Sequence, residues 1–530
     1  LRTYANRYGI ATFFVGGVGW LTAVEESQLA DVPPWIVGAR ADWFSILDGA
    51  AQQSAAIFGP KDAAYVSAIA TVRETLTRFR ATSPRDRKKA SELCNDVLAE
   101  EIVGPLADAA GAKQIRLTGR GGSGKTTTLA LLAKRLALIN GERVLVLTFH
   151  KTLRGDIAHL LRSIVDVPGI VGRKIVVETV VDFFETALVA LGAAVPCNDD
   201  GTRDFARFDA VLDETRALLY ELPDGSGDIA NLKARDPDRF RWDYVFVDEA
   251  QDWTDAERDF LRALYGSERL VLADGLEQLI RRQTPCDWTS DVAKERRLER
   301  HLGRSLRMTS NLALFANAFA RASGLVDWQI APYEKLPGGR IVIVTGAEPS
   351  TAAFVHALRD AAALGGAEPI DALICVPPRA SGSSGEPPIV RALEAAGERV
   401  WNACDPRVRD TVPGDMQAWR VVRYDSCRGL EGWVTVALGL DDLDAVRRKY
   451  PNLAPGEIES PENVARRWLM IALTRAVHTL VIGVRDERAP IVATLRDAAS
   501  RMPDGVIEWT TAAECHRVLM PRVDRKGFSY

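Results

Sequence analysis

The sequence predicts an α/β protein with two parallel-sheet domains, preceded by an N-terminal region to which we assign no fold. From about Lys113 onward, short β-branched runs alternate with helical segments, the order typical of parallel sheets covered by helices. A second series of the same kind begins near Arg340. The chain has 530 residues, which is too long for a single hydrophobic core. Together these observations favour two α/β domains.

The first series begins with a strand and a glycine-rich loop. We expect a strand at residues 115–119, a helix at 126–140 and a strand at 143–149. Residues 152–237 are expected to be mainly helical and to form an insertion before the apolar strand that starts at Tyr244. The helix–strand alternation therefore predicts a sheet whose central strands are buried on both faces.

The second series repeats this alternation. Strands are expected at 340–346, 371–378, 398–403, 421–425, 434–440 and 479–484, with a helix at 389–398. We divide the chain into an N-terminal region of unknown role (1–112), a first domain (113–290) and a second domain (291–530). The N-terminal region contains a basic stretch at 78–90, to which no chemistry can be assigned.

Composition limits the possible partners and compartment. The net charge is −4, so a nucleic acid would have to be bound in a locally basic groove. No apolar stretch approaches the roughly 18 residues of a membrane helix, and we expect no membrane partner. The seven cysteines are scattered without paired spacing, which predicts neither zinc nor disulfides and favours a cytoplasmic location. A signal peptide is not expected, and the missing initiating Met indicates a fragment or a processed product.

The segment GRGGSGKT fits the phosphate-loop pattern G-x-x-x-x-G-K-[ST] between a strand and a helix. Its glycines allow backbone N–H groups to face phosphate oxygens, and the helix N-terminus adds positive charge. We expect Lys125 to reach the β- and γ-phosphates and Thr126 to ligate Mg²⁺. The alternative is a glycine-rich turn with a chance GKT. The predicted nucleotide-binding residues of this loop are Gly119, Gly121, Gly122, Ser123, Gly124, Lys125, Thr126 and Thr127.

The run YVFVDEAQDW, Tyr244 to Trp253, ends a buried strand in three carboxylates. Carboxylates at the carboxyl end of a parallel strand repel one another, so a cation is expected there. We assign Asp248 to Mg²⁺, and Glu249 to the orientation and deprotonation of an attacking water. Helix capping explains Asp252 equally well. With the phosphate loop, these residues predict ATP and Mg²⁺ as cofactors.

The remaining motifs occur in the order found in superfamily 1 helicases, which the chain resembles over roughly residues 113–485. The branch it resembles is the UvrD/Rep-like one, typified by bacterial Rep and repair helicases. The motifs are GRGGSGKT, TFHK, ETVVDFF, VDEAQD, LADGLEQLIRR, LGRSLRMTSN, SCRGLEG and LMIALTRA. The resemblance implies two RecA-like P-loop domains with ATP in the cleft between them.

Further site residues follow from this resemblance by position. It implies that Gln251 and Gln278 sense the γ-phosphate and that Glu431 contacts the nucleotide sugar. Arg307 and Arg475 would reach the γ-phosphate from the second domain when the cleft closes, coupling hydrolysis to domain motion. The alternative for either arginine is a surface salt bridge.

The resemblance also implies contacts with single-stranded nucleic acid. The predicted contacts are Thr148, Phe149, His150, Thr179, Phe183 and Arg281. Bases stack on aromatic rings without regard to sequence, although a core position is an open alternative for either phenylalanine. Arg281 stands where the family usually has a stacking aromatic. The basic cluster at 294–304 either follows phosphates or is a solvated helix face.

Some positions depart from the family pattern. No glutamine occurs at 90–113, where the family reads adenine, so the base preference is open. Asp425 replaces a common histidine and Arg428 a lysine. About 120 residues separate Arg307 from Arg428, so the large regulatory insertion of many relatives is missing. This predicts a compact motor that translocates well and unwinds poorly without a partner.

Three functions remain in competition. We expect first an ATP-dependent helicase or translocase on single-stranded DNA, with RNA less expected and 3′ to 5′ movement implied by the resemblance. DNA repair and defence against foreign DNA both suit such a motor. The second is a nucleotide-switched module that binds nucleic acid or protein and hydrolyses ATP slowly. In the third, region 1–112 is the remnant of, or docks, a nuclease or other effector protein.

Overall fold

The computed structural model divides the chain into two units, Leu1–Arg80 and Ala81–Tyr530. In the first unit it describes a three-stranded sheet of β1 (Thr12–Val15), β2 (Val18–Leu21) and β3 (Ile36–Val37). In the second it describes residues 81–94, 97–165, 170–198, 203–220, 227–275, 285–325, 327–346, 352–364, 366–377, 386–409, 411–449 and 460–519. The candidate site lies entirely within this second unit.

The first sheet of the second unit has six parallel strands in the order β6-β5-β7-β8-β4-β9. Its strands are β4 (Gln114–Thr118), β5 (Val144–Thr148), β6 (Ile175–Thr179), β7 (Tyr244–Val247), β8 (Leu270–Asp274) and β9 (Arg297–His301). The strands expected at 115–119, 143–149 and Tyr244 are thus confirmed. Three were not expected: β6 lies in the segment expected to be mainly helical, β8 had no predicted counterpart, and β9 is an edge strand where a helix face was considered.

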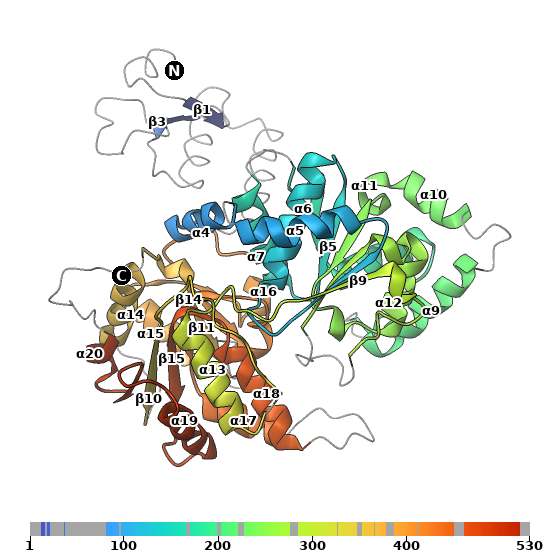
Figure 1. The fold of residues 1–530 in the computed structure, drawn as a ribbon. Coiled ribbons are helices and arrows are strands. Elements are labelled where there is room, and N and C mark those ends of the chain that lie inside the picture. Colours follow the sequence, from blue (N-terminus) through green and yellow to red (C-terminus); the bar gives the residue numbers. More distant parts are fainter. Residues whose placement is uncertain are drawn as a thin grey trace. The chain divides into compact units, whose positions relative to one another are not determined.

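Helices cover this sheet, as Figure 1 shows for α5 and α6. The helices of this lobe are α4 (Pro84–Cys94), α5 (Val97–Ala109), α6 (Lys125–Ile139), α7 (Lys151–Ile164), α8 (Val180–Ala190), α9 (Phe205–Tyr220), α10 (Gly227–Arg235), α11 (Pro237–Phe240) and α12 (Asp255–Tyr265). Three 3-10 helices also belong to this lobe: η2 (Ala250–Asp252) precedes α12, η3 (Ser267–Arg269) precedes β8, and η4 (Lys294–Arg296) precedes β9. Helix α12 begins where a capping box of Thr254 and Glu257 satisfies its first N–H groups.

The second sheet has seven parallel strands in the order β12-β13-β11-β14-β15-β10-β16. Its strands are β10 (Arg340–Thr345), β11 (Ala372–Val376), β12 (Arg399–Asn402), β13 (Ala418–Arg423), β14 (Gly432–Ala437), β15 (Ala476–Val484) and β16 (Ile507–Thr511). Its helices are α13 (Ser310–Ala322), α14 (Ala352–Leu364), α15 (Pro388–Ala395), α16 (Pro406–Arg409), α17 (Leu440–Lys449), α18 (Pro461–Leu473), α19 (Pro490–Ser500) and α20 (Cys515–Leu519), with 3-10 helices η5 (Pro369–Asp371) and η6 (Tyr424–Ser426). All six strands expected in this half, and the helix at 389–398, are confirmed.

The predicted fold class is therefore confirmed: the chain is an α/β protein whose two parallel sheets are compatible with two RecA-like domains. We call residues 81–302 the first lobe and residues 303–519 the second lobe. Strand β9 continues the first sheet past residue 290, because it pairs in parallel with β4. Each sheet has buried apolar clusters on its faces. In the described part of the chain, the helices are too short or too polar to cross a membrane.

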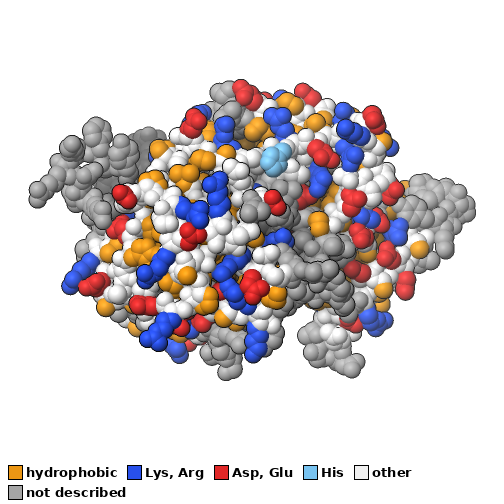
Figure 2. Space-filling model, turned by 60° about the horizontal axis from the view of Figure 1, so that its bottom comes forward, with side chains coloured by type: hydrophobic (Ala, Val, Ile, Leu, Met, Phe, Trp, Pro, Cys, Tyr) orange, Lys and Arg blue, Asp and Glu red, His pale blue; other side chains and the backbone are white. Residues whose placement is uncertain are grey.

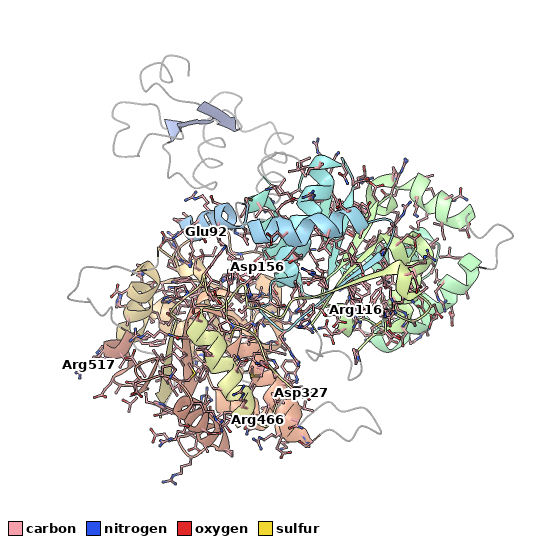
Figure 3. The ribbon with its side chains drawn as sticks, in the orientation of Figure 1. Glu92, Arg116, Asp156, Asp327, Arg466 and Arg517 are labelled. Atoms are coloured by element: carbon pink, nitrogen blue, oxygen red, sulfur yellow. The ribbon has the colours of Figure 1, made fainter. Side chains whose placement is uncertain are left out.

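Several ion pairs join the two lobes. Arg420 on β13 lies 3.4 Å from the carboxylate of Asp156 on α7, which Figure 3 labels. Arg428, which follows η6, bonds Glu249 of the first lobe. Both arginines are almost fully buried. The carboxyl ends of the first sheet's strands thus face charged groups of the second lobe.

Candidate nucleotide site

In the phosphate loop, backbone carbonyl groups of the loop itself bind the lysine side chain. Gly124 has φ 88° at the N-cap of α6, a left-handed conformation that favours glycine. Lys125 is 7% exposed, and its Nζ donates to the carbonyls of Gly119 (2.7 Å) and Arg120 (3.1 Å). Burial lowers the pKa of Lys125, and Glu249 and Asp248 oppose that effect. A phosphate would therefore have to take this lysine from two backbone carbonyls.

Thr126 and Asp248 meet beside this loop. The Thr126 hydroxyl donates to Asp248 Oδ1 at 3.3 Å. The other oxygen of Asp248 is buried and has no hydrogen-bond partner in the described part of the chain. Burial, with the neighbouring Glu249 charge, raises the pKa of Asp248. A buried carboxylate with one unused oxygen beside a hydroxyl suits Mg²⁺, which prefers oxygen ligands and would compensate this charge.

Glu249 is held in an uncommon backbone conformation. Its φ of 52° and ψ of 46° lie in the left-handed region, which non-glycine residues occupy at a cost of about 1–3 kcal/mol. Its Oε2 accepts from Gln251 Nε2 and from Arg428, each at 2.9 Å. Burial alone would raise the pKa of Glu249, but the charges of Arg428 and Lys125 outweigh it and hold the pKa below its usual range. In this state Glu249 is a weak base.

Gln251 supports Glu249 and also binds the end of β8. Its Oε1 accepts from the backbone N–H of Gly275 at 2.6 Å. A Cβ at Gly275 would lie 2.6 Å from Gln251 Nε2 and 2.8 Å from Glu249 Oε2, so this close approach requires glycine. Gln251, predicted to sense a phosphate, is here a neighbour of the predicted base. Gln278 and Arg281 lie outside the described residues.

The second lobe contributes two arginines to the same place. Arg307 Nε donates to Glu431 Oε2 at 3.1 Å, and its other nitrogens lie 3.4 Å from the carbonyls of Thr474 and Gly429. Arg475 is 2% exposed and donates to the Ile471 carbonyl at 2.7 Å. Burial, followed by the charge of Arg307, lowers the pKa of Arg475 to about 10. A surface salt bridge, the alternative considered for both arginines, does not describe Arg475.

One pocket between the lobes collects most of these groups. From the second lobe it is lined by Arg307, Glu431 and Arg475. From the first lobe it is lined by Glu249 and by the loop residues Gly121, Gly122, Gly124, Lys125, Thr126 and Thr127. Ser123 is buried in the same loop, and its hydroxyl has no partner in the described part of the chain. The structure thus brings together residues that are up to about 350 positions apart in the sequence.

Two residues of this region were not identified as site residues from the sequence. Arg428 is 1% exposed and bonds both Glu249 and Asp252 across the lobes. The only signal was its replacement of a lysine in the SCRGLEG motif. Lys89 on α4 lines the pocket and bonds Glu431. It belongs to the basic stretch at 78–90, and nothing in its spacing connects it to the other motifs.

Thr148, Phe149 and His150 follow one another at the carboxyl end of β5. Thr148 is fully buried, whereas Phe149 is half-buried and packs edge-on against Trp253 with ring centroids 5.6 Å apart. His150 stands at the N-cap of α7. Burial, followed by the charge of Arg428, lowers the pKa of His150 to about 4, so its ring is neutral at pH 7. Stacking with a base requires exposed aromatic surface. Of these three residues, we consider Phe149 the best candidate, because its phenyl ring is only half-buried.

The other two predicted contacts that the structure describes, Thr179 and Phe183, have structural roles. The Thr179 hydroxyl accepts from the Asp182 N–H and caps α8. Phe183 is 1% exposed and packs edge-on against Phe184 and Phe240. For Phe183 the structure favours the core alternative, because its ring has no open face on which a base could stack.

Comparisons with known proteins add little to this geometry. No protein-family model matches the chain, and no curated protein matches it. Among solved structures, the chain is similar to the arterivirus nonstructural protein 10 helicase at 15% identity, with a TM-score of 0.28. The match covers 73% of this chain and 63% of the viral protein, so the chain spans less than two thirds of that protein. A likeness at this level carries no argument about activity, which therefore depends on the site itself.

Proposed function

We propose that this chain is an ATP-dependent helicase or translocase that acts on single-stranded DNA. The observation that carries the proposal is the pocket in which a phosphate loop of one lobe faces Arg307, Glu431 and Arg475 of the other. A nucleotide in this pocket would touch both lobes. Its binding and hydrolysis would therefore change how the lobes are held together, as a motor requires.

The first lobe has groups for the phosphates and the attacking water. Lys125 would exchange its two carbonyl partners for phosphate oxygens, and Thr126 and Asp248 would hold Mg²⁺. When bound, Mg²⁺ would neutralise developing phosphate charge. Glu249 would orient and deprotonate the water once its bond to Arg428 is broken or lengthened, because that arginine lowers its basicity.

The second lobe has groups for the transition state. Arg307 and Arg475 are held by oxygens of their own lobe, chiefly Glu431 and the Ile471 carbonyl. To reach a γ-phosphate they would have to leave these partners, and we propose that they do so as the lobes close on the nucleotide. Arginines placed in this way contribute about 10³–10⁵ in rate in other phosphoryl-transfer enzymes. Hydrolysis would then depend on lobe closure.

The nucleic-acid track is proposed from local features. The net charge is −4, and Figure 2 shows basic and acidic side chains interspersed over one face. A surface of mixed charge provides no broad electrostatic attraction for a nucleic-acid backbone. Local contacts near the carboxyl ends of the first sheet's β-strands would therefore be needed to bind the nucleic acid. Phe149 at the end of β5 is the aromatic group we propose for stacking. The resemblance implies 3′ to 5′ movement, and a role in DNA repair or in defence against foreign DNA suits such a motor.

A second candidate function is supported by one observation. Glu249, the proposed base, is bound by Gln251 and Arg428, and its pKa is held low. If this arrangement persists with ATP bound, hydrolysis would be slow and the chain would act as a nucleotide-switched module that binds nucleic acid or a protein partner.

Steady-state ATP hydrolysis tests both candidates. It would be measured without nucleic acid, with single-stranded DNA and with single-stranded RNA, using Glu249→Gln as the blank. We expect strong stimulation by single-stranded DNA and a rate near background for the variant. If neither polymer changes the rate of ATP hydrolysis, the result would contradict the helicase or translocase function and support the nucleotide-switched module. Lys125→Ala should weaken nucleotide binding, whereas Arg475→Ala should bind ATP and hydrolyse it slowly.

A further inference from the structure

Helix α4 belongs to the first lobe and also contacts the second lobe. On one side Asp86 lies 3.0 Å from His159 Nε2 of α7 in the first lobe. On the other, the hydroxyl of Ser83, which directly precedes α4, donates to Asp371 of the second lobe at 2.8 Å, and the Arg85 guanidinium of α4 lies over the ring of Trp433. These contacts hold α4 beside the pocket that Lys89 lines.

Lys89, on this helix, shares one carboxylate with Arg307. Lys89 bonds Oε1 of Glu431, and Arg307 Nε donates to Oε2 of the same group. Burial alone would raise the pKa of Glu431, but the charges of Lys89 and Arg307 outweigh it and hold the pKa at about 2. Glu431 therefore stays ionised, with one cation on each oxygen.

Arg307 and Lys89 differ in whether they would leave Glu431 when a nucleotide binds. Arg307 lies in the nucleotide pocket and has been assigned to the γ-phosphate, a move that takes it away from Glu431. If Lys89 remains, the carboxylate keeps a counter-charge when Arg307 leaves. Without Lys89, the same move would leave an unpaired carboxylate beside the phosphates, which is strongly unfavourable.

We propose that Lys89 is a positioning residue that frees Arg307 for the nucleotide by keeping Glu431 neutralised. The inference rests on the proposed function, since it takes Arg307 to act on a phosphate. It predicts that Lys89 influences turnover through Arg307 and contributes less to ground-state binding of ATP. Nothing in the GLE or phosphate-loop motifs implies this role for a residue of α4.

The test is a double-mutant cycle. Single-stranded-DNA-stimulated turnover and the ATP dissociation constant would be measured for wild type, Lys89→Gln, Arg307→Ala and the double variant. We expect Lys89→Gln to lower kcat by about 10- to 100-fold, the effect of losing one charge-assisted hydrogen bond, with a smaller change in ATP affinity. In the Arg307→Ala background the same substitution should change kcat less than threefold, because the residue through which it acts is gone.

Two further variants distinguish the loss of the Lys89 charge from a general effect of the substitution on folding. Lys89→Arg should recover most of the turnover because it keeps the cation. Lys88→Gln is the matched control: its side chain is 72% exposed, with Glu92 at 3.9 Å, and it should behave as wild type. Unchanged kcat in Lys89→Gln, or an equal loss in both backgrounds, would overturn the proposal. A wild-type protein that binds ATP but has no turnover would instead refute the proposed function, and the inference with it.

Discussion

Arg428 compensates two buried carboxylates, and its removal should be costly. In Arg428→Ala, Glu249 and Asp252 keep their positions but lose the cation that both contact. Removing one partner of a buried pair costs about 3–5 kcal/mol, because a charge stays behind without compensation. Two charge-assisted bonds at roughly 1.5–3 kcal/mol each give a similar figure. We therefore expect a loss of about 3–5 kcal/mol in the free energy of unfolding.

The loss should depend on pH. In the wild type the pKa of Glu249 lies below its usual range, so its ionised form stabilises the fold above the unfolded pKa. That contribution is lost as the pH falls through the folded pKa. In Arg428→Ala, burial is opposed only by the charge of Lys125 and the hydrogen bond from Gln251, so the pKa should move upward and less of this stabilisation should remain at pH 7. The difference from wild type should shrink from pH 7 towards pH 4.5.

Guanidinium unfolding followed by tryptophan fluorescence at both pH values measures this difference. The control is Arg399→Ala, whose side chain is 71% exposed and pairs with Asp415 on the surface. Its effect should be about 0–1 kcal/mol. If Arg428→Ala matched this control, or if its deficit were the same at both pH values, the two carboxylates would not depend on Arg428.

Three further predictions concern the site and its flanks. Gly275→Ala should reduce turnover, because the new Cβ would overlap Gln251 and Glu249, whereas Gly104→Ala, with open space around it, should not. Asp248→Asn should abolish the difference between nucleotide affinities measured with Mg²⁺ and with EDTA. Phe149→Ala should weaken binding to fluorescent single-stranded DNA by about 1–3 kcal/mol. Phe183→Ala should instead cost about 3–5 kcal/mol of stability and leave the DNA affinity of the folded protein unchanged.

The sequence predicted those features that are encoded over a few neighbouring residues. The glycines of the phosphate loop, the β-branched strand before Asp248 and the helix that follows Lys125 each have a local signal, and each lies where it was expected. The fold class followed from the alternation of such segments. Strand β9 was not recognised because its residues, Arg297 to His301, are mostly charged, and pairing with β4 makes them a strand at a sheet edge.

Other features depend on contacts between distant residues. Phe183 stands in a motif position, but whether its ring faces solvent or core is decided by Phe184 and Phe240. In the sequence, Lys89 is one of several basic residues at 78–90. Its contact with Glu431 arises only because the fold places α4 against the second lobe. No local pattern in either segment contains this information, because it arises only when the chain folds.

The charges of the site indicate which bonds a nucleotide would have to break. Lys125 binds two carbonyls of its own loop, and Arg307 binds Glu431, so both would change partners when phosphates enter. The bond between Arg428 and Asp252 is different, because neither group lines the pocket. It can persist while the phosphate-facing contacts rearrange. If the pocket binds ATP as we propose, any rotation of the lobes that changes the distance from Arg428 to Glu249 would also change the basicity of that carboxylate, because the charge of Arg428 lowers its pKa.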